Sequence, residues 1–224
     1  LHFTDRRQRQ MCIRDRRHDY PAAARTLQAL LDLSPEDPRA HWLLAQTLIK
    51  LGQGDAATEV IIRARTLGLT EDTREFELRA LLLRGKAEDA WARLATVRDI
   101  EQRPGLHILR ADTALLLGRI ADARADYDAL VETNEVASRA HLGLARVHLG
   151  SGERQLAAER LAKALELNEY DADALLLAGD LALGDRRWDS ARNAYERARA
   201  LRPRNPRPVL GLIGIAVAQE RLDT

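Results

Sequence analysis

A turn recurs every 33 or 34 residues along this 224-residue chain. Each turn joins two segments that are rich in leucine and alanine. A period of this length is typical of solenoids, because each unit is too small to bury its own apolar face and stacks on its neighbours instead. The turns fall at Gly52, Gly85, Gly118, Gly152 and Arg186.

Small residues recur in phase with these turns. Aromatic residues make up only 4% of the chain while Ala, Leu and Arg are abundant, which favours helices over strands. An alanine at one fixed place in each second segment would let two helices pack at axis distances of about 8–10 Å. These alanines are Ala57, Ala90, Ala123, Ala157 and Ala191, and four places later come Ile61, Leu94, Tyr127, Leu161 and Tyr195. The first segments carry Ala45, Ala111, Ala145 and Gly179.

These positions resemble the tetratricopeptide repeat (TPR) consensus, which has small residues at its eighth, twentieth and twenty-seventh places. The resemblance covers residues 19–224 and is weaker in repeat three, where Leu78 replaces the small residue. It implies an all-α fold, a right-handed α-solenoid of TPR helix–turn–helix repeats. A lone second helix is expected over about 19–33, complete repeats two to six over 38–70, 71–103, 104–137, 138–171 and 172–205, and a lone first helix over about 206–221.

The first sixteen residues differ from the rest of the chain. Residues 6–16, RRQRQMCIRDR, match the translation of a common transposon-based sequencing primer, and they hold the only Cys and the only Met. We expect residues 1–16 to be a non-native, adapter-derived segment on a metagenomic fragment, followed by the repeat array over 17–224. A genuine basic arm is the alternative. Because the final segment, VLGLIGIAVAQ, lacks the polar face of a capping helix, we also expect an excerpt from a longer array.

No motif associated with catalysis occurs in the sequence, which has no GxSxG, HExxH or glycine-rich phosphate loop. Three histidines share the fourth place of the first segment, which indicates a packing role and not a metal site. We therefore expect no enzyme activity, no metal and no cofactor. These histidines are His41, His107 and His141, and three acidic residues expected on a solvated helix face are Asp122, Asp126 and Asp128.

Charge and hydropathy argue against two classes of partner. The formal net charge is +1, and no basic face is clustered as nucleic-acid binding would require. No apolar stretch reaches the roughly 20 residues that span a bilayer. A protein or peptide partner remains, of an identity that the sequence does not specify.

The TPR resemblance implies that the partner binds the concave face, which first helices line. Such a groove suits an extended peptide or a helix. The polar and aromatic candidates are Arg39, Trp42, Gln46, Lys50, Glu75, Arg79, Asp112, Arg139, Arg146 and Asp180. Apolar candidates on the same face are Ile49, Leu82, Ile108, Leu142 and Leu176.

Two features refine this prediction. Trp42 is either an anchor for the partner or a packing residue between first helices, and the sequence leaves both open. Chaperone-binding TPR proteins hold a terminal carboxylate with Lys, Arg and Asn on first helices. Because the asparagines here lie outside first helices, we do not expect a chaperone co-factor.

Three segments, 59–94, 174–206 and 211–223, resemble the PrsT-type TPR proteins of the bacterial exosortase/PEP-CTERM system. In the first of them, a repeat end leads into a Leu/Ala-rich first helix followed by a short turn. This resemblance implies a periplasmic scaffold in envelope or exopolysaccharide assembly, although a cytoplasmic location stays open. The alternative is the TPR arm of a larger enzyme, a glycosyltransferase or sulfotransferase, with its catalytic domain beyond Thr224.

Overall fold

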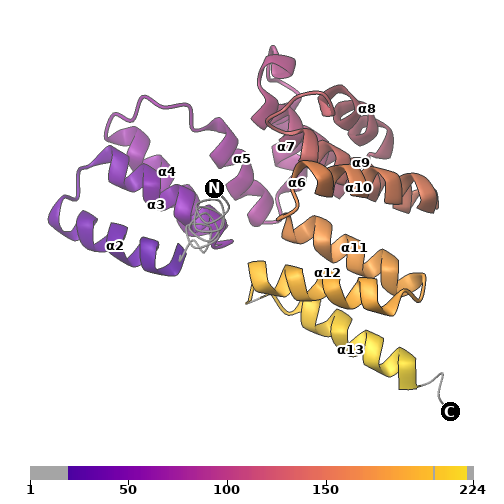
Figure 1. Cartoon of the computed structure of the whole chain (residues 1–224). Helices are drawn as coiled ribbons and strands as arrows, with labels where there is room; N and C mark the ends of the chain where they lie inside the picture. Colours follow the sequence, from indigo (N-terminus) through magenta and orange to yellow (C-terminus); the bar gives the residue numbers. More distant parts are fainter. Residues whose placement is uncertain (1–19, 204, 221–224) are drawn as a thin grey trace, which may run out of the picture. The chain divides into compact units, whose positions relative to one another are not determined.

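The structure is a computed structural model that describes residues 20–203 and 205–220. This part of the chain consists of twelve α-helices and one short 3-10 helix, with no strand (Figure 1). The all-α expectation is therefore confirmed. The expectation that residues 1–16 are adapter-derived lies outside the described residues.

The helices belong to two compact units, which divide between residues 97 and 98. Within each unit, every helix packs on the next, and in three cases a first helix also contacts the following first helix. The first unit contains α2 (Tyr20–Leu33), α3 (Pro38–Lys50), α4 (Gly54–Thr66), α5 (Arg74–Leu83) and α6 (Ala87–Leu94). The second unit contains η1 (Ile100–Gln102), α7 (Pro104–Leu116), α8 (Ile120–Leu130), α9 (Ala137–Gly150), α10 (Arg154–Leu167), α11 (Ala172–Gly184), α12 (Trp188–Leu201) and α13 (Arg207–Glu220).

The turns within the repeats have one shared backbone conformation. All five predicted turn residues have positive φ, the left-handed region that glycine enters without steric cost. The residue that follows each of these turn residues donates a backbone hydrogen bond to the first helix. Gln53 N–H, for example, donates to the Leu48 carbonyl oxygen at 2.9 Å. The φ angles are 76° at Gly52, 73° at Gly85, 72° at Gly118, 78° at Gly152 and 58° at Arg186.

The predicted alanine positions form the contacts between helices. All five second-helix alanines are fully buried, and so are the larger residues four places later. Repeat three departs from the others as the sequence indicated. Its helices α5 and α6 have only 10 and 8 residues, and Leu78 is buried where the other repeats have a small residue.

Two helix starts are fixed by aspartate caps. The side chain of Asp37 accepts hydrogen bonds from the backbone N–H groups of Arg39 and Ala40, at 2.8 and 3.1 Å. Asp171 accepts the equivalent pair from Asp173 and Ala174. These bonds satisfy N–H groups that have no partner within the first turn of a helix.

Two of the three fourth-place histidines, His107 and His141, are buried, as expected from a packing role. The third, His41, is partly buried, and its Nε2 lies 2.9 Å from the Pro35 carbonyl oxygen. The prediction of a solvated face was wrong for one of the three aspartates. Asp126 is buried between α7 and α8, where Arg110 Nε donates to its carboxylate at 2.8 Å and His107 Nε2 lies 3.2 Å away. A buried carboxylate needs such partners because desolvation is otherwise costly.

Candidate partner-binding groove

The predicted concave-face residues fall in both units. Those in the first unit are Arg39, Trp42, Gln46, Lys50, Glu75 and Arg79, on α3 and α5. Those in the second unit are Asp112, Arg139, Arg146 and Asp180, on α7, α9 and α11. The two groups have different surroundings, and we describe them in turn.

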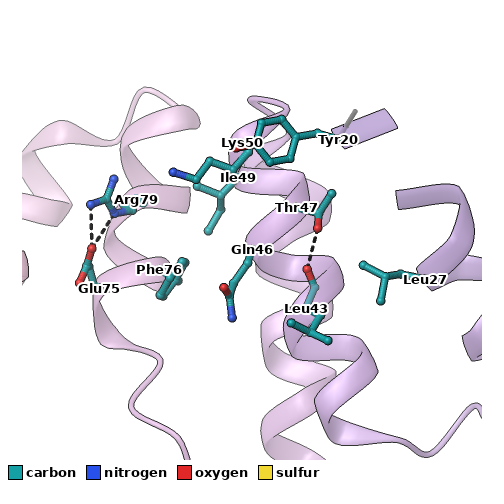
Figure 2. A pocket seen from close by; sticks show the side chains of 10 residues that line it. All are labelled: Tyr20, Leu27, Leu43, Gln46, Thr47, Ile49, Lys50, Glu75, Phe76 and Arg79. Atoms are coloured by element: carbon teal, nitrogen blue, oxygen red, sulfur yellow. Dashed lines mark hydrogen bonds and ion pairs between the residues drawn. The ribbon is translucent and has the colours of Figure 1, made fainter. Parts of the chain in front are cut away.

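A cavity of about 670 Å³ opens beside α2, α3 and α5 in the first unit. Figure 2 shows its side chains converging from these three helices. Five of the predicted residues line it, namely Gln46, Ile49, Lys50, Glu75 and Arg79. The remaining lining residues are Tyr20, Leu27, Leu43, Thr47 and Phe76.

The cavity combines apolar walls with a charged edge. Leu43 is 51% exposed, although the equivalent Leu109 of the second unit is only 2% exposed. Glu75 accepts from Arg79 Nε at 2.9 Å and from its terminal nitrogen at 2.7 Å, so these two charges form one ion pair one helical turn apart. Uncovered apolar side chains beside polar groups are typical of ligand and peptide grooves.

Sequence reasoning missed the contribution of α2. Tyr20 and Leu27 line the cavity from a second helix, whereas only first helices were considered as lining elements. Helix α2 packs on α3, the first helix of the next repeat, and Leu27 is partly buried in that contact. A lone second helix was visible in the repeat phase, and that observation could have led to these residues.

Trp42 and Arg39 lie on α3 but do not line the cavity. The Trp42 ring packs edge-on against Phe76 of α5, with ring centroids 4.7 Å apart and an interplanar angle of 79°. Edge-to-face pairs of this kind stabilise contacts between helices. The geometry favours the packing role of Trp42 over the anchor role.

In the second unit, Asp112 is held from two sides. The Tyr127 hydroxyl of α8 donates to one carboxylate oxygen at 2.6 Å, and Arg139 of α9 pairs with the other. Burial, reinforced by the Asp112 charge, raises the pKa of Tyr127 far above its usual value. This aspartate therefore connects two successive repeats.

The same arrangement recurs two repeats later. Asp180 accepts from the Tyr195 hydroxyl at 2.7 Å and pairs with Arg207 of α13 at 3.2 Å. Burial and then the hydrogen bond to Asp180 raise the pKa of Tyr195. Each tyrosine ring lies against a glycine of a neighbouring helix, where a side chain would not fit. A Cβ on Gly143, for example, would come 2.2 Å from the Tyr127 ring.

Repeat five lies between these two arrangements and differs in charge. It has Arg146 at the place of the aspartates, Leu161 at the place of the tyrosines and Asp173 at the place of the arginines. Arg146 is exposed and forms no ion pair with the described residues. The shared 68-residue spacing of Asp, Tyr, Arg and Gly was present in the sequence and could have revealed this pairing.

The apolar candidates of the second unit do not form an open surface. Ile108, Leu142 and Leu176 are all buried beneath neighbouring helices. The prediction that they line a groove was therefore wrong. The reason is that the fifth place of a first helix is covered when the next repeat packs on it, as it does throughout this unit.

Within residues 20–203 and 205–220, no helix combines the length and apolarity needed to cross a bilayer. Over the same ranges, His, Cys, Asp and Glu side chains do not assemble into any group of three that could hold a metal ion.

Several solved structures have a similar fold. A thermophilic TPR protein from Thermus thermophilus is 20% identical with a TM-score of 0.68, over 80% of this chain and 99% of that one. PilW, a widely conserved type IV pilus biogenesis factor, is 19% identical with a TM-score of 0.58, over 87% and 91%. PilF of Pseudomonas aeruginosa is 18% identical with a TM-score of 0.56, over 90% and 91%. At these identities the likeness shows the fold.

Comparison with models of protein families identifies the same type of repeat. No curated protein matches the chain. One model, described as a tetratricopeptide repeat, matches residues 16–66. A second, with the same description, matches residues 108–172, 142–206 and 176–224, and so spans more than half of the chain. The sequence, the helix pairs and these matches agree that the chain belongs to the tetratricopeptide repeat family.

Proposed function

We propose that this protein is an interaction scaffold and that the groove of the first unit binds an apolar-faced segment of a protein partner. The observation that carries the proposal is the cavity beside α2, α3 and α5, where Leu43 is 51% exposed although the equivalent Leu109 is 2% exposed. Burying such side chains contributes about 25 cal/mol per Å² of apolar area. No part of this proposal requires a reaction.

The shape and chemistry of the groove favour a helix with one apolar face. Leu27, Leu43 and Phe76 offer apolar contacts from three helices. Lys50 and the ion pair of Glu75 with Arg79 offer polar contacts at the edge. A partner segment with apolar residues at helical spacing and polar residues on its flanks would match both parts.

The second unit contributes a polar surface to this proposal. We propose Arg146 as a contact for an acidic group of a partner, because its side chain is exposed and forms no ion pair with the described residues, whereas Asp112, Arg139 and Asp180 are paired. Asp112, Arg139 and Asp180 are proposed to position the helices around it, since their charges are already paired. In the first unit, Trp42 is proposed to support the groove by packing against Phe76, which lines the cavity. Arg39 lies on the same helix as Trp42, outside the cavity.

The groove proposal can be tested with a displayed library of random peptides of about 15 residues, long enough for about four helical turns. Peptides selected on the chain should bind it in solution and lose at least tenfold in affinity for Leu43→Glu. The matched control is Ile62→Glu, which changes an equally exposed residue of α4 outside the cavity. Selected peptides that bind Leu43→Glu and the unmodified chain equally well would overturn the proposal.

A finer proposal concerns the pathway. We propose that the scaffold acts in bacterial envelope or exopolysaccharide assembly, and the PrsT-type resemblance of segments 59–94, 174–206 and 211–223 supports it. The test is the complete native gene, expressed with a C-terminal tag and followed by cell fractionation. We expect a periplasmic product. A cytoplasmic product, or a transferase domain in the same reading frame, would contradict this assignment.

A further inference from the structure

Two junctions between successive first helices of the second unit are closed by an ion pair. Asp112 of α7 pairs with Arg139 of α9, and Asp180 of α11 pairs with Arg207 of α13 at 3.2 Å. In each pair the arginine lies 27 residues after the aspartate, near the start of the next first helix. The same helices also pack on each other, α7 on α9 and α11 on α13.

The junction between α9 and α11 has the same two places with the charges reversed. Arg146 of α9 occupies the place of Asp112. Asp173 of α11 follows at the place of Arg139. Within the described residues, Arg146 and Asp173 do not form an ion pair, and α9 is not in extensive contact with α11. Asp173 instead accepts a hydrogen bond at 2.9 Å from Arg202, which follows α12.

This arrangement leaves Arg146 accessible. Its side chain is exposed and forms no ion pair with the described residues. The space beside it is open, because a Cβ added to Gly150, one helical turn later on the same face, would meet nothing within 4 Å. Leu161 occupies the place of the two tyrosines and brings no hydroxyl group to this position. A carboxylate from outside the chain can therefore approach the guanidinium group.

The charges around Arg146 favour an anion. Burial and then the Asp112 charge raise the pKa of Tyr127, and the charges of Arg146 and Arg139 act in the opposite direction. Arg146 therefore lies within electrostatic reach of the Tyr127 hydroxyl, where two arginines face the single carboxylate of Asp112. On the α11 side of the junction, both carboxylates are already matched by an arginine. The excess positive charge suits a single carboxylate, because a polyanion such as nucleic acid would need several clustered cations.

We propose that the junction between α9 and α11 binds an acidic peptide segment of a partner, whose aspartate or glutamate side chain pairs with Arg146. This inference rests on the proposed function, since it specifies the partner chemistry at the Arg146 contact. The planar guanidinium group can donate to both oxygens of the partner carboxylate. Arg202 is a positioning residue for this site, because it holds Asp173 and so prevents Asp173 from pairing with Arg146.

The test uses the full chain and a displayed library of peptides of about seven residues, which span about 23 Å when extended. Each peptide has a fixed central glutamate, and its other positions exclude large apolar residues. The library therefore does not suit the apolar groove of the first unit. Selection on the unmodified chain should enrich a subset of these peptides, and fluorescence anisotropy then measures their affinity for each variant.

Arg146→Glu should lower the affinity of the selected peptides about tenfold or more, because it removes a charge-assisted hydrogen bond and adds repulsion. The same peptides with lysine in place of the central glutamate should bind Arg146→Glu better than the unmodified chain. The matched control is Arg199→Glu, which reverses an exposed arginine of α12 and should bind the selected peptides like the unmodified chain. If Arg146→Glu fails to fold, as judged by circular dichroism, Arg146→Gln replaces it.

The positioning role of Arg202 has its own test. Arg202→Ala frees Asp173 to pair with Arg146 and compete with the peptide, so the affinity should fall severalfold. Adding Asp173→Asn should restore the affinity to at least that of the unmodified chain, because the competing carboxylate is gone. A merely structural role of Arg202 would not be rescued by this second substitution. The control is Arg197→Ala, which removes another exposed arginine of α12, a donor to the Glu169 carbonyl oxygen, and should leave the affinity unchanged.

A selection that enriches no peptide, or peptides that bind Arg146→Glu and the unmodified chain equally well, would overturn the site at Arg146. Unchanged affinity in Arg202→Ala, or a loss that Asp173→Asn does not restore, would overturn the positioning role of Arg202. Leu43→Glu separates these results from the groove proposal, since it should leave the affinity of the acidic peptides unchanged. If random-library peptides depend on Leu43 but no acidic peptide depends on Arg146, the groove proposal stands and this inference fails.

Discussion

At the residue scale, one turn position breaks the glycine pattern. Arg186 adopts a φ of 58°, where its four equivalents are glycines. A residue with a Cβ in this region costs about 1–2 kcal/mol relative to its preferred conformation. The turn of repeat six nevertheless has the same hydrogen bond as the glycine turns, because Arg187 N–H donates to the Ala182 carbonyl oxygen at 2.9 Å.

We expect Arg186→Gly to raise the free energy of unfolding of the second unit by about 0.5–1 kcal/mol. Gly152→Ala, in the equivalent turn, should lower it by about the same amount or more, although nothing lies within 4 Å of the added Cβ. Urea denaturation followed by circular dichroism measures both. A destabilised Arg186→Gly would show that the arginine side chain stabilises the turn through contacts of its own.

His141 makes stability depend on pH. Its burial, followed by the nearby charges of Arg160 and Lys163, lowers the pKa of His141, with Glu132 acting in the opposite direction. Its Nδ1 is buried without a hydrogen-bond partner. The unfolded chain therefore binds a proton more readily than the folded chain, so stability falls as pH decreases below about 6.5.

The variant His141→Leu should remove this part of the pH dependence. Melting temperatures of the unmodified chain and of the variant should be measured between about pH 7.5 and about pH 5, a range that includes the ordinary histidine pKa of about 6.5. On acidification, the melting temperature of the variant should fall less than that of the unmodified chain. Parallel curves would indicate that His141 does not titrate in this range.

At the element scale, helix spacing depends on alanine. Ala191 of α12 is fully buried in the cluster that includes Leu175, Tyr195 and Ile215. A long side chain there has no space unless α11 and α12 separate. The helix face was predicted from the repeat phase, and the burial confirms it.

We expect Ala191→Arg to destabilise the second unit by about 1–3 kcal/mol or more, because overpacking displaces the helices and a charge is buried. Ser190→Arg is the control, since Ser190 is exposed on the same helix one residue earlier. Thermal melting compares the two variants. Equal melting temperatures would contradict the assigned phase of α12.

Most elements could be predicted from the sequence because their determinants are local. Turn glycines and the spacing of alanines define where helices α3 to α12 begin and end to within a few residues. The environment of Asp126 could not be read in this way. Its solvated neighbours Asp122 and Asp128 lie on the same helix, and only the position of Arg110 on α7 explains why this carboxylate is buried.

At the scale of the whole molecule, the helices in extensive contact within each unit belong to the same repeat or to adjacent repeats, over the residues that the structure describes. Stability in such proteins is approximately a sum of repeat terms and interfaces between adjacent repeats. A local defect should therefore have a limited range. This property distinguishes a repeat array from a domain with a single core, in which a defect is shared by all elements.

Amide hydrogen exchange on Ala191→Arg tests this expectation. Exchange should become faster in α11, α12 and α13, while protection in α3 and α4 should match that of the unmodified chain. Mass spectrometry of peptic fragments resolves these helices. A uniform loss of protection across all helices would indicate global cooperativity and contradict the additive description.

The sequence by itself determined the repeat period, the turns, the buried alanine faces and the absence of known catalytic motifs, because each depends on residue type at a fixed spacing. The tertiary structure alone decided which charges are available to a partner. Asp112 and Asp180 lie on the predicted face, but tyrosine and arginine partners from adjacent helices already bind them. The tertiary structure also added Tyr20 and Leu27 of α2 to the groove. Pairing and exposure depend on how side chains of neighbouring repeats meet, and the pattern within one repeat does not specify that.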